Sequence, residues 1–125
     1  MPAIRTYRDL VAWQKGMTLS KALYVATRRM PASEQFGLTS QMRRAAVSVP
    51  SNVAEGYALE STRAYLKHLR IARGSLAELA TQWELAVNLQ MVPQDANVLS
   101  LLGETDRVLQ GLIRAVRASK RRRTR

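Results

Sequence analysis

Polar side chains recur at helical spacing between residues 41 and 55, and these residues are the best placed in the sequence to do chemistry. Successive steps of three or four residues separate Gln41, Arg44, Ser48, Asn52 and Glu55. At about 100° per residue, an α-helix gathers all five within an arc of roughly 80°. Three interpretations of this polar stripe are open: a solvated face, a hydrogen-bond network between helices, and a catalytic or ligand-binding site.

The network interpretation specifies which residues interact. Arg44 is expected to pair with Glu55. Ser48 and Asn52 are expected to satisfy backbone groups that lose their helical partner at Pro50, because proline has no N–H to donate. In this interpretation the polar stripe joins two helices and does not face the solvent.

Partners for such a network are expected on the next helical segment. Ser75 and Glu78 are the facing residues, and the small Gly74 beside them is expected to permit close approach of the two helices. The single histidine, His68, lies on the same segment. Because a general acid or base needs a tuned neighbour and a pocket, we interpret His68 as an ordinary surface or boundary residue.

Few residue types in this sequence suit catalysis or metal binding. There is no Cys, which excludes disulfides, thiolate catalysis and iron–sulfur clusters. One His and no Glu-x-x-His pair leave a carboxylate-bridged metal site in a helical bundle without its usual ligands. Gly-rich phosphate-binding motifs are absent as well. We therefore expect no catalytic residue, no metal and no cofactor, and a protein that is not an enzyme.

The balance of charge indicates an acidic partner. The sequence has 20 Lys and Arg residues against nine Asp and Glu, a formal net charge of +11. Such a basic chain is typical of proteins that bind nucleic acid. The candidate contacts to RNA or DNA form two stripes and a terminal cluster: Arg63, Lys67 and Arg70; Arg107, Arg114 and Arg117; and Lys120, Arg121, Arg122, Arg123 and Arg125.

A solubilising surface is the alternative interpretation of either basic stripe alone. The stripe that runs directly into the terminal cluster favours binding, because the cluster extends its reach along a phosphate backbone. The aromatic residues lie mostly at core spacing and are not interleaved with the cations. We therefore expect electrostatic binding with weak sequence preference.

Helical periodicity runs through the sequence. The first helical segment ends at Pro31, since the residue before a proline avoids the α conformation. The second is expected to begin with Thr39 or Ser40 as its N-cap and to end with Gly56 in the left-handed conformation. Pro50 lies inside the second helix and is expected to kink it without ending it.

The third segment, capped by Ser61 or Thr62, and the fourth, beginning near Asp95, are equally regular. Four long amphipathic helices with short connections predict an all-α fold, an antiparallel up-down-up-down four-helix bundle. The bundle is expected over residues 1–118, with a disordered basic tail over 119–125. No apolar run is long enough to span a membrane and no signal peptide is visible, so we expect a cytoplasmic protein.

The first segment also predicts self-association. It carries two apolar stripes, which is more than one neighbouring helix can cover. Leu19, Leu23 and Met30 are the residues left over, and an exposed apolar patch of this kind marks an interface. We therefore expect Leu23→Glu to produce a monomer or a much weaker oligomer.

Residues 41–56 read QMRRAAVSVPSNVAEG and closely resemble the signature of the bacterial four-helix bundle protein family. Its members are also known as intervening-sequence proteins, encoded within inserts of large-subunit ribosomal RNA genes. Tyr7–Trp13, Gly37–Thr39 and Ala72–Leu79 match the family too, so the similarity covers about residues 7–116. The motif residues that carry over are Arg43, Arg44, Ser48, Pro50, Asn52, Glu55 and Gly56.

The resemblance implies a helical bundle that assembles into a ring-like homo-oligomer, a homopentamer. Accessory proteins of diversity-generating retroelements look like distant relatives, and those bind a reverse transcriptase and nucleic acid through a basic ring surface. The family's molecular role is poorly defined, so the resemblance indicates the fold more directly than the function.

Three classes of function follow. The first, which we favour, is a non-enzymatic homo-oligomeric protein that binds RNA or an RNA–protein complex electrostatically through its basic surface and tail. The second is a protein-interaction scaffold that recruits a partner such as a reverse transcriptase or a ribosomal component. The third is an enzyme that uses Arg44, Asn52 and Glu55.

Overall fold

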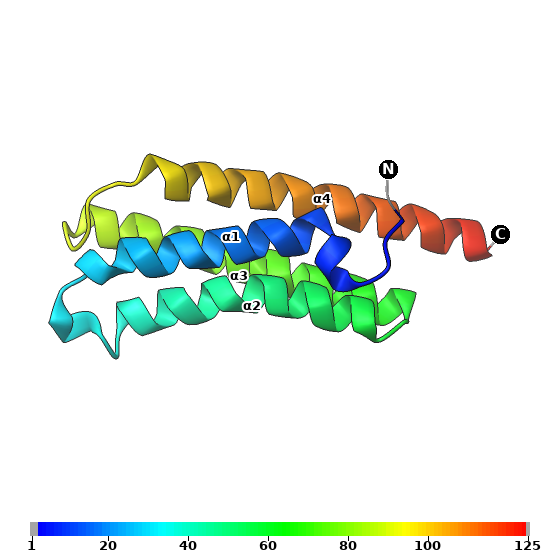
Figure 1. Ribbon diagram of the computed structural model, residues 1–125, viewed down its shortest axis with the longest axis horizontal. Helices are drawn as coiled ribbons and strands as arrows, with labels where there is room; N and C mark the ends of the chain where they lie inside the picture. The colour runs from blue at the N-terminus through cyan, green and yellow to red at the C-terminus, as the bar shows by residue number, and fades with distance from the viewer. Residues whose placement is uncertain (1–2, 125) are drawn as a thin grey trace.

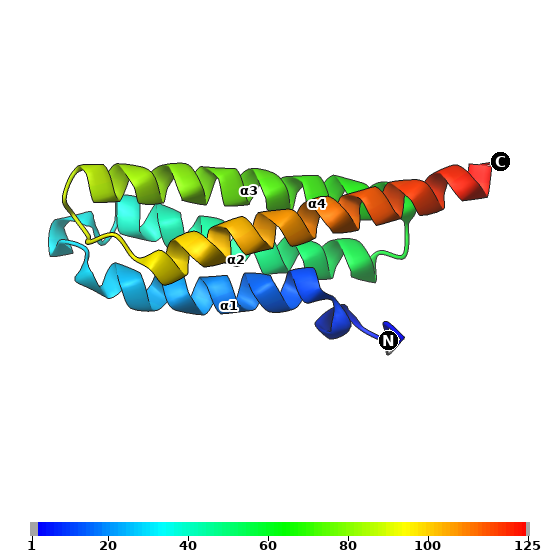
Figure 2. The same ribbon diagram turned by 90° about the horizontal axis from the view of Figure 1, so that it is seen from above.

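Four long helices form in the computed structural model, which describes the backbone of residues 3–124 and the side chains of residues 3–120. Their bounds are α1 (Val11–Ala26), α2 (Leu38–Ala58), α3 (Thr62–Asn88) and α4 (Ala96–Thr124). Short 3₁₀ turns occupy Tyr7–Asp9, Thr27–Arg29 and Ala32–Glu34. Successive helices run in opposite directions (Figures 1 and 2), and the described residues contain no strand. The prediction of an all-α chain of four antiparallel helices is confirmed.

Two helix starts lie where the sequence placed them. The Ser61 hydroxyl accepts a hydrogen bond from the N–H of Ala64 at 3.2 Å, which caps α3. The Asp95 carboxylate accepts from the N–H groups of Asn97 at 2.9 Å and Val98 at 3.1 Å, at the start of α4. Both side chains satisfy backbone donors that a helix leaves without an internal partner.

The two ends of α2 differ from the prediction. Its N-cap is Gly37, and the N–H of Leu38 donates to the Glu34 carboxylate at 3.0 Å, so neither Thr39 nor Ser40 is the cap. Gly56 lies inside the helix, and the left-handed residue is Glu60, with φ of 53°. Gly56 serves close packing, because a Cβ added there would lie 2.8 Å from the Cβ of His68 on α3.

α4 continues through Thr124, so the described chain is helical where the sequence predicted a disordered tail. Neither Gly nor Pro interrupts residues 119–124, and Lys and Arg are good helix formers. Cations in the last turn also interact favourably with the helix dipole. The end of α4 extends past the connection between α2 and α3 (Figure 2). Arg125 lies outside the described residues.

The core is the apolar seam that all four helices share. α1 packs against α2 and α4, and α3 packs against the same two helices from the other side. The largest fully buried side chain is Trp83 of α3, whose indole N–H donates to the Gln94 side chain at 2.8 Å. This bond satisfies the polar atom of an otherwise apolar residue. None of the helices, as far as the structure describes them, is long and apolar enough to cross a membrane.

α1 buries the stripe that the sequence assigned to an intermolecular interface. Leu19 and Leu23 are fully buried and Met30 is almost so, which contradicts the prediction that these residues are left over. Met17 and Tyr24, two residues of the other apolar stripe, are exposed instead. Periodicity identified two apolar stripes, but it did not indicate which of them faces the core.

Pro50 lies in the middle of α2, and the helix continues through it. The carbonyl of Ala46, four residues earlier, loses its helical donor there. The Ser20 hydroxyl of α1 lies 3.1 Å from that carbonyl oxygen and 2.8 Å from the carbonyl oxygen of Gly16. A Cβ added at Gly16 would lie 3.1 Å from the Cβ of Pro50, so the two helices approach closely at this point. The predicted kink stays a prediction.

Leu23→Glu is now expected to prevent folding, in place of the monomer predicted from the sequence. The fully buried position has no partner for a carboxylate, and burying an unpaired charge costs several kcal/mol, a large part of a domain's total stability. Circular dichroism and thermal unfolding measure the loss. The matched variant Val25→Glu, at an exposed position of the same helix, should retain its helicity; equal behaviour of the two variants would contradict the packing of α1.

Candidate functional site

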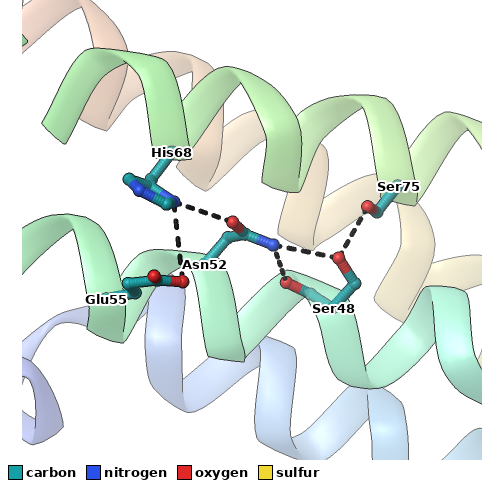
Figure 3. Close-up of polar contacts among 5 residues, drawn as sticks. All are labelled: Ser48, Asn52, Glu55, His68 and Ser75. Atoms are coloured by element: carbon teal, nitrogen blue, oxygen red, sulfur yellow. Dashed lines mark hydrogen bonds and ion pairs between the residues drawn. The ribbon is translucent and has the colours of Figure 1, made fainter. Parts of the chain in front are cut away.

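A polar network joins α2 to α3 (Figure 3). The Ser48 hydroxyl lies 2.8 Å from the Ser75 hydroxyl. Asn52 donates from its side-chain amide to the carbonyl oxygen of Ser48 at 2.9 Å and to the Ser48 hydroxyl at 3.0 Å. On its other side, the Asn52 amide oxygen lies 2.9 Å from Nδ1 of His68. All four side chains are partly buried.

The direction of each hydrogen bond follows from the chemistry of the groups. The carbonyl oxygen of Ser48 can only accept, so the Asn52 nitrogen must face it and the Asn52 oxygen must face His68. His68 therefore carries its proton on Nδ1 and donates it to Asn52. Since the Ser48 hydroxyl accepts from Asn52, its own proton is available for Ser75. The network is a chain of donors that begins at His68 and reaches Ser75.

The charged members of the stripe lie outside this chain. Arg44 donates to the hydroxyl of Ser40 at 3.2 Å on the exposed side of α2, and the expected pair of Arg44 with Glu55 does not form. The Glu55 carboxylate lies 3.8 Å from Nδ1 of His68, with 63% of its side chain exposed against 15% for His68. This contact is an ion pair only when the imidazole is protonated, and with the carboxylate so exposed it contributes little to stability.

The structure brings together some predicted residues and separates others. Ser75 meets Ser48 as expected, whereas Glu78 accepts a hydrogen bond from Gln82 at 3.3 Å. A Cβ added at Gly74 would have no atom within 4 Å, so the helices do not approach closely there. The predicted role of Gly74 is wrong. His68 lies in the network, which sequence reasoning missed; its spacing of seven residues from Ser75 is the signal that could have indicated this.

Arg43, the other charged residue of the motif, ties α2 to the end of α1. Its Nε donates to the Thr27 hydroxyl at 2.9 Å, and its guanidinium lies 4.5 Å from the centre of the Tyr24 ring. A terminal nitrogen donates to the carbonyl oxygen of Tyr24 at 3.3 Å. Hydrogen bonding combined with a cation–π contact gives Arg43 a structural role that Lys could not reproduce.

Residues from each of the two predicted basic stripes meet between α3 and α4. Because α3 and α4 are antiparallel, the beginning of α3 lies beside the later part of α4 (Figure 2). Arg70 of α3 lines the same groove as Arg114 and Arg117 of α4. Sequence reasoning missed Arg73, which also lines the groove, although it lies one helical step beyond Arg70.

The remaining basic residues of the two stripes are exposed on the same two helices but do not line the groove. Arg63 and Lys67 are exposed on α3, and Arg107 and Lys120 are exposed on α4. The predicted contacts at residues 121–123 belong to the last turns of α4, with side chains outside the described part, and Arg125 also lies outside it. We call the α3–α4 surface that carries these arginines and lysines the basic face.

Neither the network nor the basic face holds a cluster of metal-ligating residues. Across the described residues, no group of three or more His, Cys, Asp or Glu side chains is placed to hold a metal ion. The structure instead has a hydrogen-bonded contact between α2 and α3, and a surface of arginine and lysine side chains on α3 and α4. Guanidinium groups suit phosphate, because their N–H donors match its oxygens in pairs.

Comparison with known protein families gives a match. The model of one family, described as 23S rRNA-intervening sequence protein, matches residues 8–114. This match covers more than half of the chain and confirms the resemblance that the motif of residues 41–56 carries. No curated protein matches the chain.

Asn52→Ala is expected to reduce the free energy of unfolding by about 1–3 kcal/mol, because it leaves partly buried groups of Ser48 and His68 without their partner. Urea unfolding measures the difference. Ser51→Ala, a change at the next position on the exposed side of α2, should stay within about 0.5 kcal/mol of the parent. Equal stability of the two variants would show that the network does not hold α2 to α3.

Proposed function

The chain belongs to the 23S rRNA-intervening sequence protein family, and from that membership we propose that it is a non-enzymatic, homo-oligomeric protein that binds RNA. The binding is electrostatic and uses the basic face of α3 and α4. The RNA is bound alone or as part of an RNA–protein complex, and the protein catalyses no reaction of its own.

One observation carries the proposal: the arginines of α3 and α4 converge on one side of the bundle. Arg70, Arg114 and Arg117 line one groove, and the sequence adds five further cations among its last six residues. A protein that neutralises phosphates releases counterions, which supplies most of the free energy of non-specific nucleic-acid binding. A surface that served only solubility would have no need to align its cations between two helices.

Self-association is the second part of the proposal, and it uses the opposite pair of helices. Met17 and Tyr24 of α1 and Val47 of α2 are exposed apolar residues on helices that pack side by side. Apolar patches of this kind favour an interface between copies of the chain. A ring-like homopentamer formed in this way would leave the basic faces free, and binding by five of them would raise avidity.

A protein-interaction scaffold is the alternative function, and one feature favours it. The Phe36 ring, in the connection between α1 and α2, is 89% exposed. An aromatic side chain so exposed is a typical anchor for a protein partner, such as a reverse transcriptase or a ribosomal component. Co-purification that depends on Phe36 and not on the basic face would support this alternative.

Deletion of residues 120–125 should flatten the dependence of log K on log salt by about 2–4 units, since each lost phosphate contact contributes about 0.7–0.9. Fluorescence anisotropy with a labelled RNA at several salt concentrations measures the slope. The matched control, Arg28→Gln with Arg29→Gln, removes exposed cations at the other end of the bundle (Figure 1) and should leave the slope unchanged. An unchanged slope after the deletion would contradict the role of the α4 end.

Met17→Glu should weaken or abolish the oligomer, because it places a charge in the proposed interface between copies. Light scattering coupled to size-exclusion chromatography measures the mass. Leu99→Glu is the matched control: Leu99 of α4 has the same exposed fraction as Met17, 47%, but lies on another helix. A parent protein that is monomeric at micromolar concentration would overturn self-association while leaving RNA binding untouched.

A further inference from the structure

α3 and α4 border a groove whose shape and chemistry go beyond a charged surface. Its volume is about 940 Å³, and it runs between the facing sides of the two helices. Apolar side chains form its floor, among them Leu76 and Ala80 of α3 and Leu102 and Ile113 of α4. Ligand sites commonly combine such an apolar surface with a few charged or polar groups.

Glycines keep the groove open. Gly74 of α3 and Gly103 of α4 both line it. A Cβ added at Gly74 would meet no atom within 4 Å, and one added at Gly103 would meet only the mobile end of Arg107, at 3.4 Å. Larger side chains at these positions would therefore fill the groove without disturbing the packing of the bundle.

The groove attracts anions. Arg70, Arg114 and Arg117 line it, and its single acidic residue is Asp106. The Asp106 carboxylate is already engaged, since Nε of Arg73 donates to it at 2.9 Å and the Gln110 amide donates at 2.6 Å. The guanidinium groups of Arg70, Arg114 and Arg117 can therefore bind an anionic ligand. Because the floor of the groove is apolar, that ligand should also have an apolar or aromatic face.

We propose that this groove binds single-stranded RNA, with an unstacked base against the apolar floor and the neighbouring phosphates on Arg70, Arg114 and Arg117. This inference rests on the proposed function and adds the class of RNA that is recognised. The face of a base that has left its stack is apolar enough to cover the floor, and the flanking phosphates supply the matching charge.

Base pairing excludes the duplex form from this mode of binding. In a double helix the faces of the bases are stacked on one another, so a duplex can offer only phosphates and groove edges to the basic face. In a single strand the bases can turn outward and stack on arginine planes as well as on aromatic rings. The cations of the groove can therefore contact both the base and its phosphates.

The test uses variants that fill the groove without changing its charge. The full-length protein is titrated against a labelled single-stranded RNA of about 12 nucleotides, without self-complementarity, and against the duplex of the same sequence. Gly74→Leu should weaken single-strand binding at least about fivefold and change duplex binding less than twofold. Gly103→Leu is a second groove-filling variant with the same expectation. Ala96→Leu is the control: it adds a leucine side chain at an exposed position of α4 that does not line the groove, and it should leave both affinities unchanged.

The outcomes separate this inference from the function it rests on. If the parent protein binds neither RNA, the proposed function fails, and the groove assignment fails with it. If the parent binds both forms and the groove-filling variants behave like Ala96→Leu, RNA binding stands and the groove assignment is wrong. If an acidic amphipathic peptide binds the parent and loses affinity on Gly74→Leu, while RNA binding is unaffected, the groove belongs to a protein partner and the inference is overturned.

Discussion

The missing N–H of Pro50 is the constraint around which the helices are arranged. It leaves the Ala46 carbonyl in the middle of α2 without its helical donor, and an unsatisfied buried carbonyl is costly. α1 places the Ser20 hydroxyl 3.1 Å from that oxygen, where its proton is shared with the Gly16 carbonyl at 2.8 Å, and it packs Gly16 against the proline ring. Since Gly16 and Ser20 are one helical turn apart, they fix where α1 crosses α2. The other side of α2 is then free for α3, through the network and the close approach at Gly56.

Sequence periodicity predicted the helices but not how they meet. The alternating apolar spacing of α3 corresponds to side chains that are buried, and Ser61 and Asp95 cap their helices as expected. Periodicity describes each helix alone, so it does not determine the rotation of one helix about its axis, or its shift along that axis, relative to a neighbouring helix. For that reason the sequence did not identify His68 as a partner of Asn52. It also predicted close helix packing at Gly74, whereas the helices approach closely at Gly16 and Gly56. Composition alone likewise suggested a disordered tail where the backbone continues as helix.

The family motif and the predicted nucleic-acid contacts lie on different helices. Residues of the family motif lie on α2, where they join α2 to α1 and α3, so the motif describes packing more than a binding site. The cations expected to contact nucleic acid lie on α3 and α4, outside the motif. A chain of this kind can keep its fold while its binding surface changes, because few residues serve both purposes. The exposed apolar residues Met17 and Val47 lie on the other two helices, α1 and α2.

The central claim is that RNA lies along the basic face. Hydrogen–deuterium exchange of the full-length protein, with and without a saturating single-stranded RNA, tests it most directly, because amides at a contact surface become protected on binding. Protection should appear in α3 over residues 67–80 and in α4 over residues 103–117, and it should be absent from the exposed side of α1. Protection confined to α1 and α2, or no change at saturation, would contradict the claim.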